Sequence, residues 1–249
     1  MTTNAKQVAD RIEGVLASDQ WAAILKSTSG RMRLGDTTSF KLKEELDQGN
    51  LSLVFNYELG KEGLFLSTYD GKFISGESVQ KKLGDKARSG IERTFNAAGS
   101  YVFSLQEAIN LLEGRSVLKS YVSMDGVEKN GWFKAENGAK SKDLQFFFSG
   151  GQVILPNYDL GGVLKKLPMA AGNFVQNREL IRSLQYGDLQ AVKLTNNAEV
   201  ATCFIQADPA SKSALLFDET GRRMEIPQLT VDGSLVNTRR HRDKGLSMG

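Results

Sequence analysis

The sequence has little of what metal and nucleophilic chemistry most often needs: it contains one cysteine and one histidine in 249 residues. Cys203 has no second cysteine to pair with, so an intramolecular disulfide framework is excluded. A structural zinc site usually takes four cysteine or histidine ligands, which this chain cannot supply. A catalytic triad would have to use His241, close to the end of the chain, where a preorganised site on rigid elements is hard to build. We therefore predict no catalytic residue, no metal ligand and no cofactor.

Long apolar runs are also missing. No run approaches the ~20 residues that a membrane-spanning helix needs, and Met1–Ala17 carries charged residues throughout instead of an apolar signal-type core. The composition, 40% hydrophobic and 24% charged, is ordinary for a soluble globular protein. We expect a cytoplasmic protein with no membrane partner and with a core large enough to need no disulfide or metal.

The stretch Ser104–Phe148 contains the strongest local signals. Ser104 and Glu107 form a capping box at a helix start, apolar residues follow at helical spacing, and Gly114 supplies the left-handed residue that ends a helix. Strand-like runs come next, at Val117–Ser123, Gly131–Ala135 and Leu144–Phe148. The pattern predicts one helix followed by an antiparallel sheet, with a turn at Asp125-Gly126.

The C-terminal part repeats this layout. It predicts a helix over Arg178–Leu184 with Asn177 as its N-cap and Gly187 at its end. Three strands follow, at Gln190–Leu194, Glu199–Gln206 and Ala214–Phe217. Cys203 is interpreted as a small core residue, because no neighbouring base or cation would lower its pKa.

The N-terminal part is a weaker copy. A first helix is predicted over Val8–Leu25, and a short one over Ser39–Leu46 with Ser39 as its N-cap. The predicted strands are Leu51–Tyr57 and Leu64–Thr68, with Asp70-Gly71 as a turn before Phe73 and Ile74. The polar segment Ser78–Ala97 is interpreted as a helix.

Each predicted unit has a helix that ends in Leu-x-x-Gly, at Gly49, Gly114 and Gly187, and the unequal spacing of these glycines argues against a fixed-period solenoid. The predicted fold is α+β, with repeated helix-plus-antiparallel-β-sheet units, an N-terminal helix and a flexible basic C-terminal tail. The predicted divisions are 1–100, 101–174, 175–233 and the tail 234–249. The expected core residues are Leu112, Val117, Phe133, Phe147, Leu184, Val192, Phe204 and Phe217.

The net charge is only +3, so the placement of the basic residues matters more than their number. One group lies in the segment Ser78–Ala97 and the other in the tail Thr238–Gly249, which we expect to be mobile. A solvated surface and a phosphate-contacting surface both fit such a distribution. The candidate nucleic-acid-binding residues are Lys81, Lys82, Lys86, Arg88, Arg93, Arg239, Arg240, Arg242 and Lys244.

Nucleotide-binding loops are absent as motifs. Neither Gly-x4-Gly-Lys-Ser/Thr nor Gly-x-Gly-x-x-Gly occurs, so the pairs Gly150-Gly151 and Gly161-Gly162 are interpreted as turns. Asp125, Glu128 and Lys129 form a loose acid-rich cluster that a metal-dependent phosphodiesterase could use.

The second and third units resemble an uncharacterised domain family of Bacteroidota proteins, often encoded on conjugative and mobilisable elements. Leu111-Leu-Glu-Gly114 and Leu184-Gln-Tyr-Gly187, with the strands after them, are similar to its repeated motif. The ending Gly245-Leu246-Ser247-Met248 after Arg239–Arg242 is similar too. The resemblance covers about residues 104–248 and implies an accessory role on a mobile element, without a catalytic residue to carry over.

Three functions stay open at this level. The first is a non-enzymatic accessory protein that binds DNA or a nucleoprotein complex through its basic surface and tail. The second is a protein–protein interaction module without nucleic-acid contact, in which an exposed sheet edge accepts a partner strand. The third is the metal-dependent phosphodiesterase. A continuous basic groove on the folded protein would favour the first.

Overall fold

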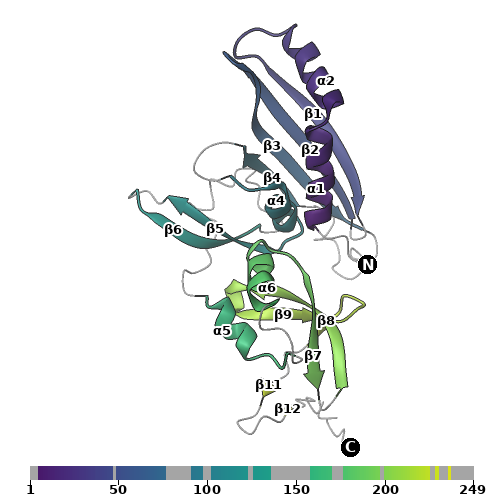
Figure 1. Ribbon diagram of the computed structural model, residues 1–249, viewed down its shortest axis with the longest axis vertical. Helices are drawn as coiled ribbons and strands as arrows, with labels where there is room; N and C mark the ends of the chain where they lie inside the picture. The colour runs from purple at the N-terminus through teal and green to yellow at the C-terminus, as the bar shows by residue number, and fades with distance from the viewer. Residues whose placement is uncertain are drawn as a thin grey trace, which may run out of the picture.

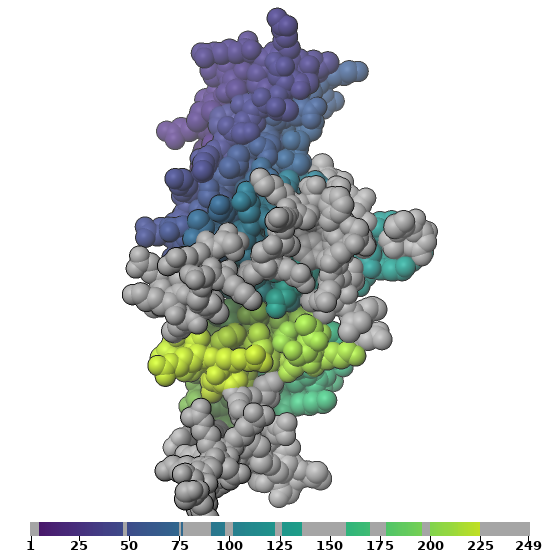
Figure 2. Space-filling view, turned by 180° about the vertical axis from the view of Figure 1, so that it is seen from behind, coloured from purple at the N-terminus to yellow at the C-terminus, as the bar shows by residue number. Residues whose placement is uncertain are grey.

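The computed structural model describes residues 5–46, 49–76, 91–97, 102–122, 126–135, 158–169, 176–196, 199–224, 228–229 and 235–236. The fold is α+β, as the sequence predicts, and its buried side chains form two clusters. Figure 1 shows the N-terminal helices and sheet at one end of an elongated molecule and the C-terminal sheet toward the other. Figure 2 shows the same succession from behind, with purple and blue atoms at one end and yellow-green atoms further along.

The first sheet is a four-stranded antiparallel meander. Its strands are β1 (Thr37–Leu46), β2 (Gly49–Gly60), β3 (Gly63–Ser75) and β4 (Ile91–Asn96), in the order β1-β2-β3-β4. The helices α1 (Ala5–Leu16) and α2 (Asp19–Ser29) lie over one of its faces (Figure 1). Alternate residues of the strands are buried toward these helices, including Leu51, Leu53, Phe55, Phe73 and Phe95.

Several sequence predictions in this part are wrong about secondary structure. The segment Ser39–Leu46, predicted as a helix, is the strand β1. Its side chains alternate with period two: Phe40 and Leu42 turn toward the helices, while Lys41 and Lys43 are exposed. Phe40 packs edge-on against Trp21 of α2 at 5.0 Å between ring centroids, so a tertiary contact fixes the extended conformation.

Gly71 is the second correction, since Asp70-Gly71 is no turn but lies inside β3. A Cβ on Gly71 would lie 2.5 Å from Leu112 Cδ1, on the helix that covers this strand. The glycine therefore serves the close approach of a helix to the sheet and not a reversal of the chain.

The helical segments at the N-terminus also differ from prediction. The helix expected over Val8–Leu25 is two helices, because Ser18 caps a new one: its Oγ accepts a hydrogen bond from the Trp21 N–H at 3.2 Å. The helix expected over Ser78–Ala97 is replaced at its end by strand β4, and residues 77–90 lie outside the described part of the chain.

The middle unit agrees closely with its prediction. Helix α4 (Leu105–Leu112) begins with the capping box of Ser104 and Glu107, and Gly114 follows it at φ +81°. The strands β5 (Ser116–Val122) and β6 (Glu128–Lys134) form an antiparallel hairpin whose turn includes Gly126 at φ +76°. The predicted third strand, Leu144–Phe148, lies outside the described residues.

The two faces of the β5–β6 hairpin pack against different cores. Val117 is paired with Phe133, and both are buried in the core of the first sheet. The next pair, Leu118 and Trp132, points to the opposite face and belongs to the core of the second sheet. The middle unit therefore joins the two ends of the molecule instead of enclosing a core of its own.

The second sheet is also a four-stranded antiparallel meander, in the order β10-β9-β8-β7. It is covered by the helices α5 and α6, and Gly187 (φ +87°) follows the last turn of α6, which is the helix-ending position predicted for it. Asn177, the predicted N-cap, lies within α6, because the helix begins at Gln176 instead of at Arg178. The elements are α5 (Leu160–Lys165), α6 (Gln176–Gln185), β7 (Gln190–Asn196), β8 (Glu199–Asp208), η3 (Pro209–Ser211), β9 (Ser213–Phe217) and β10 (Arg223–Met224), followed by a short pair β11 (Gln228–Leu229) and β12 (Leu235–Val236).

The predicted core is confirmed in part. Leu112, Val117, Phe133, Leu184 and Val192 are buried. Phe204 and Phe217 are only half-buried, and they face each other across β8 and β9. The inward positions of β8 belong instead to its neighbours Cys203 and Ile205, since a strand can bury only alternate residues. Phe147 lies outside the described residues.

Candidate functional site

One of the predicted phosphate-contacting residues lies in the described part of the chain, and its prediction is wrong. Arg93 is only 4% exposed, on the inward face of β4 between Ile91 and Phe95, and its Nη1 donates to the Glu92 carbonyl at 2.7 Å. Its side chain points inward because alternate residues of a strand face opposite sides of the sheet; the prediction had placed it on a helix surface. The others, Lys81, Lys82, Lys86, Arg88, Arg239, Arg240, Arg242 and Lys244, lie outside the described residues.

Two members of the predicted acid-rich cluster lie in the described part of the chain, next to the hairpin turn. Gly126 adopts a left-handed conformation, and Glu128 and Lys129 follow it as exposed residues at the start of β6, while Asp125 lies outside the described residues. Within the described ranges, no group of three or more His, Cys, Asp or Glu side chains is placed to hold a metal ion.

Cys203 is 1% exposed in the second core, and burial raises the pKa of its thiol. A thiol held in its neutral form is a poor nucleophile. Its prediction as a core residue is confirmed.

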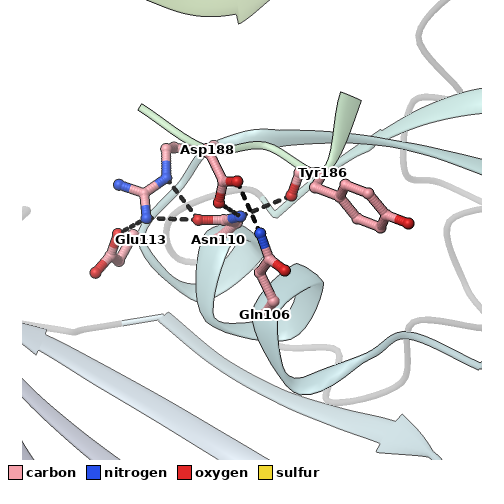
Figure 3. A network of polar contacts seen from close by, with 6 residues as sticks. Gln106, Asn110, Glu113, Tyr186 and Asp188 are labelled. Atoms are coloured by element: carbon pink, nitrogen blue, oxygen red, sulfur yellow. Dashed lines mark hydrogen bonds and ion pairs between the residues drawn. The ribbon is translucent and has the colours of Figure 1, made fainter. Parts of the chain in front are cut away.

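The most extensive buried polar arrangement lies between α4 and the loop after α6 (Figure 3). Asn110 is at its centre: its Nδ2 donates to the Tyr186 carbonyl at 2.6 Å and to Asp188 Oδ1 at 2.9 Å. Its Oδ1 accepts from Arg115 Nε at 3.0 Å and Nη2 at 2.6 Å. Arg115 also forms an ion pair with Glu113. We refer to these residues, together with Gln106 and Ser183, as the junction network.

Asp188 completes the junction network from the C-terminal side. Its Oδ2 accepts hydrogen bonds from Gln106 Nε2 and from Ser183 Oγ, each at 2.7 Å. Burial lowers the pKa of Arg115 to about 10, an effect that the charge of Asp188 partly opposes. Because Asn110, Arg115 and Asp188 are all buried, their hydrogen bonds bind α4 and the loop after α6 together in the interior of the protein.

Polar side chains form a second arrangement, on the face of the first sheet that α1 and α2 leave uncovered. Ser39 Oγ donates to Asn56 Oδ1 at 2.7 Å, and Asn56 Nδ2 donates to Thr68 Oγ1 at 3.1 Å and to Asp70 Oδ2 at 3.0 Å. Thr94 Oγ1 donates to the other oxygen of Asp70. This line of hydrogen bonds crosses all four strands, from β1 to β4, and stiffens the sheet as a platform.

The charges beside that line have both signs. Lys41, Lys43 and Lys72 lie on this face, together with Glu45, Glu58, Asp70 and Glu92, and Lys72 pairs with Glu92 at 3.6 Å. Such mixed charges do not make the continuous basic groove that nucleic-acid binding would favour.

Strand β1 forms the outer edge of the first sheet (Figure 1). The Leu59 N–H of β2 donates to the Asp36 carbonyl at 2.9 Å, which directs the backbone groups of even-numbered β1 residues toward β2. The N–H and C=O groups of odd-numbered residues therefore point away from the sheet. The exposed residues Ser39, Lys41, Lys43 and Glu45 occupy these positions, and no other described strand pairs with this edge.

The corresponding edge of the second sheet is different. The Thr195 N–H of β7 donates to the Pro168 carbonyl at 2.8 Å, and Met169 forms a β-bridge with Leu194. The segment after α5 thus covers part of β7.

A polar hollow of about 460 Å3 opens between the C-terminal end of α2 and the start of β1. Its hydroxyls are partly engaged, since Thr28 Oγ1 donates to the Ile24 carbonyl at 2.8 Å. Its charged lining residues are one cation, Arg31, and one anion, Asp36, so it has no excess charge to select a charged ligand. Its lining residues are Ser27, Thr28, Arg31, Met32, Asp36, Thr37 and Thr38.

Sequence reasoning missed the residues of the junction network, of the polar line and of the β1 edge. The alternation of polar and apolar residues over Thr37–Leu46 was the available signal for the edge strand. No local signal pairs Asn110 with Asp188, which are 78 positions apart.

Comparison with known proteins gives no assignment: no protein-family model, no curated protein and no solved structure matches this chain. None of the described helices is long and apolar enough to cross a membrane.

Proposed function

We propose that this protein is a non-enzymatic interaction module that binds a protein partner by adding a partner strand to β1. The outer edge of β1 carries the proposal: no strand among the described residues pairs with it, and its outward N–H and C=O groups are a template for a further antiparallel or parallel strand. The edge is ten residues long, and its pairing with β2 runs without a bulge.

The side chains of β1 support this function. Main-chain hydrogen bonds would supply affinity, and the alternating side chains on the two faces would supply specificity. Lys41, Lys43 and Glu45 stand on one face, and Phe40 and Leu42 on the other. An added strand therefore meets a charged surface and an apolar surface at once.

A proline at a β1 residue whose N–H points outward tests whether a partner strand pairs with this edge. Lys43→Pro removes an N–H that points away from β2, so the β1–β2 pairing is retained while an added strand loses a hydrogen bond. Lys193→Pro is the matched control, because it makes the same change on β7, at the edge of the other sheet.

The measurement is capture of proteins from nuclease-treated extract of the source organism, with each variant immobilised. We expect Lys43→Pro to lose the partner that wild type and Lys193→Pro retain, at low and at high salt. Equal capture by all three proteins would remove β1 from the mechanism.

Nucleic-acid binding by an accessory protein of a mobile element stays a prediction, since its candidate residues other than Arg93 lie outside the described part of the chain. A salt titration of full-length protein and of residues 1–237 on one labelled oligonucleotide tests it. Loss of four phosphate contacts would lower the slope of log K against log salt by about 3–4. The interaction-module proposal predicts equal slopes or no binding.

A further inference from the structure

We propose that the strand added to β1 is β1 of a second copy of this chain, antiparallel to the first, with Lys43 opposite Glu45. This inference rests on the proposed function and names its partner. A two-fold axis through the position of Glu44 would join two four-stranded sheets into one continuous sheet of eight.

Self-complementary charge is the first argument. In this register Lys43 of each copy faces Glu45 of the other, which gives two ion pairs on the exposed face. Both residues are odd-numbered, so their backbone groups already point outward and can form the ladder. The segment Leu42–Leu46, the C-terminal half of β1, is therefore matched to itself in charge and in hydrogen-bond direction.

The opposite face is consistent with the same register. Leu42 would face Leu46 of the second copy, so apolar side chains meet on the side that α1 and α2 cover. Glu44 would face its own counterpart at the axis. Each Glu44 already has a cation, because Arg11 Nη2 of α1 forms a 2.5 Å ion pair with Glu44 Oε2.

Neighbouring registers are less favourable. A shift of two residues in one direction places Lys43 opposite Lys43 and Leu42 opposite Glu44, and in the other direction it places Glu45 opposite Glu45. A shift of one residue turns the charged face of one strand toward the apolar face of the other. The register with Lys43 opposite Lys43 also places Lys41 opposite Glu45, so both registers contain opposite-charge pairs. The register centred on Glu44 is preferred because, of these three, it is the one without a like-charge pair on the exposed face.

Charge reversal tests the pairing in sedimentation equilibrium of the purified full-length protein. We expect wild type to be a dimer at high concentration, and Lys43→Glu and Glu45→Lys each to raise the dimer Kd roughly tenfold, since each creates two like-charge oppositions. The double variant Lys43→Glu with Glu45→Lys restores opposite charges across the axis, and its Kd should return to near the wild-type value. Lys193→Glu is the matched control and should leave the Kd unchanged.

Disulfide trapping tests the register independently. Glu44→Cys places two cysteines at the axis in a non-hydrogen-bonded pair, with Cα atoms about 4.5 Å apart, a separation that a disulfide accepts. Lys43→Cys serves as control, because its sulfur faces Glu45 of the second copy. Under mild oxidation we expect a covalent dimer from Glu44→Cys alone; wild type, with buried Cys203, should stay uncrosslinked.

The outcomes separate this inference from the proposed function. A wild-type protein that is monomeric at every accessible concentration, a double variant without rescue, or crosslinking of Lys43→Cys instead of Glu44→Cys would overturn it. If wild type is monomeric while Lys43→Pro still loses a captured protein, the second copy is the wrong partner and the β1 function holds. If Lys43→Pro also captures normally, both fail.

Discussion

The two four-stranded sheets of this protein have the same simple topology, but the outer sides of their first strands differ. Each is an antiparallel meander with its strands in sequence order. In the first, β1 is unpaired on its outer side among the described residues; in the second, Pro168 and Met169 contact β7. Two sheets of the same topology can therefore differ in whether a further segment contacts the outer side of their first strand.

The sheets also differ in how their aromatic residues are used. In the first sheet, Phe95 is fully buried, stacked on Tyr69 at 5.0 Å and edge-on to Phe103 at 6.1 Å. In the second, Phe204 and Phe217 pair across strands on a half-exposed face. Aromatic content alone therefore does not show where a core lies.

The largest expected effect tests this difference in the burial of aromatic residues. Phe95→Ala should lower the free energy of unfolding by about 3–5 kcal/mol, through lost burial and a cavity. Phe204→Ala should lower it by only about 1–2 kcal/mol, because its side chain is partly exposed in the folded state. Urea denaturation of the two variants measures both values. Equal losses would show that the two rings are equally buried in solution.

A smaller effect concerns the junction between the sheets. Gly187→Ala adds a Cβ at φ +87° that would lie 2.9 Å from Val117 Cγ2 and 3.0 Å from Ser116 O. We expect a loss of about 2–4 kcal/mol, the sum of left-handed backbone strain and overpacking.

Gly221→Ala is the control for Gly187→Ala, because it has a similar φ of +75° with nothing within 4 Å of the added Cβ. Its loss should be about 1–2 kcal/mol, from the backbone strain alone. Thermal melts of the pair isolate the packing contribution. If Gly187→Ala were no worse than its control, close packing between Gly187 and β5 would be refuted.

The smallest expected effect compares one buried tyrosine in each core. Tyr69 Oη donates to the Phe103 carbonyl at 2.8 Å and Tyr158 Oη donates to the Ser213 carbonyl at 2.5 Å. Burial raises the pKa of both phenols above the ordinary value of 10.0. Above pH about 10 the unfolded chain therefore loses protons that the folded protein keeps, so stability falls as pH rises further.

Tyr69→Phe or Tyr158→Phe should make that alkaline decline shallower, by up to about 1.4 kcal/mol per pH unit for each tyrosine removed. At neutral pH each substitution should cost about 1 kcal/mol, because a carbonyl loses its donor. Denaturant titrations at neutral and alkaline pH measure both quantities. An unchanged alkaline slope in either variant would show that its phenol titrates normally in the folded state.

Local signals in the sequence determined the ends of elements. The capping box of Ser104 and Glu107 and the left-handed glycines Gly114 and Gly187 were predicted correctly, because a cap or a positive φ depends on a few neighbouring residues. The hairpin of β5 and β6 was predicted for the same reason.

Tertiary structure decided which way the residues face. Pairing with β2 and packing of Phe40 against Trp21 make Ser39–Leu46 a strand. The approach of Leu112 explains Gly71, and the inward face of β4 buries Arg93. The same holds for the candidate site. The sequence of β1 determines the residues and charges of this site. That no described strand lies beside β1 is a property of the assembled sheet, which local sequence does not determine.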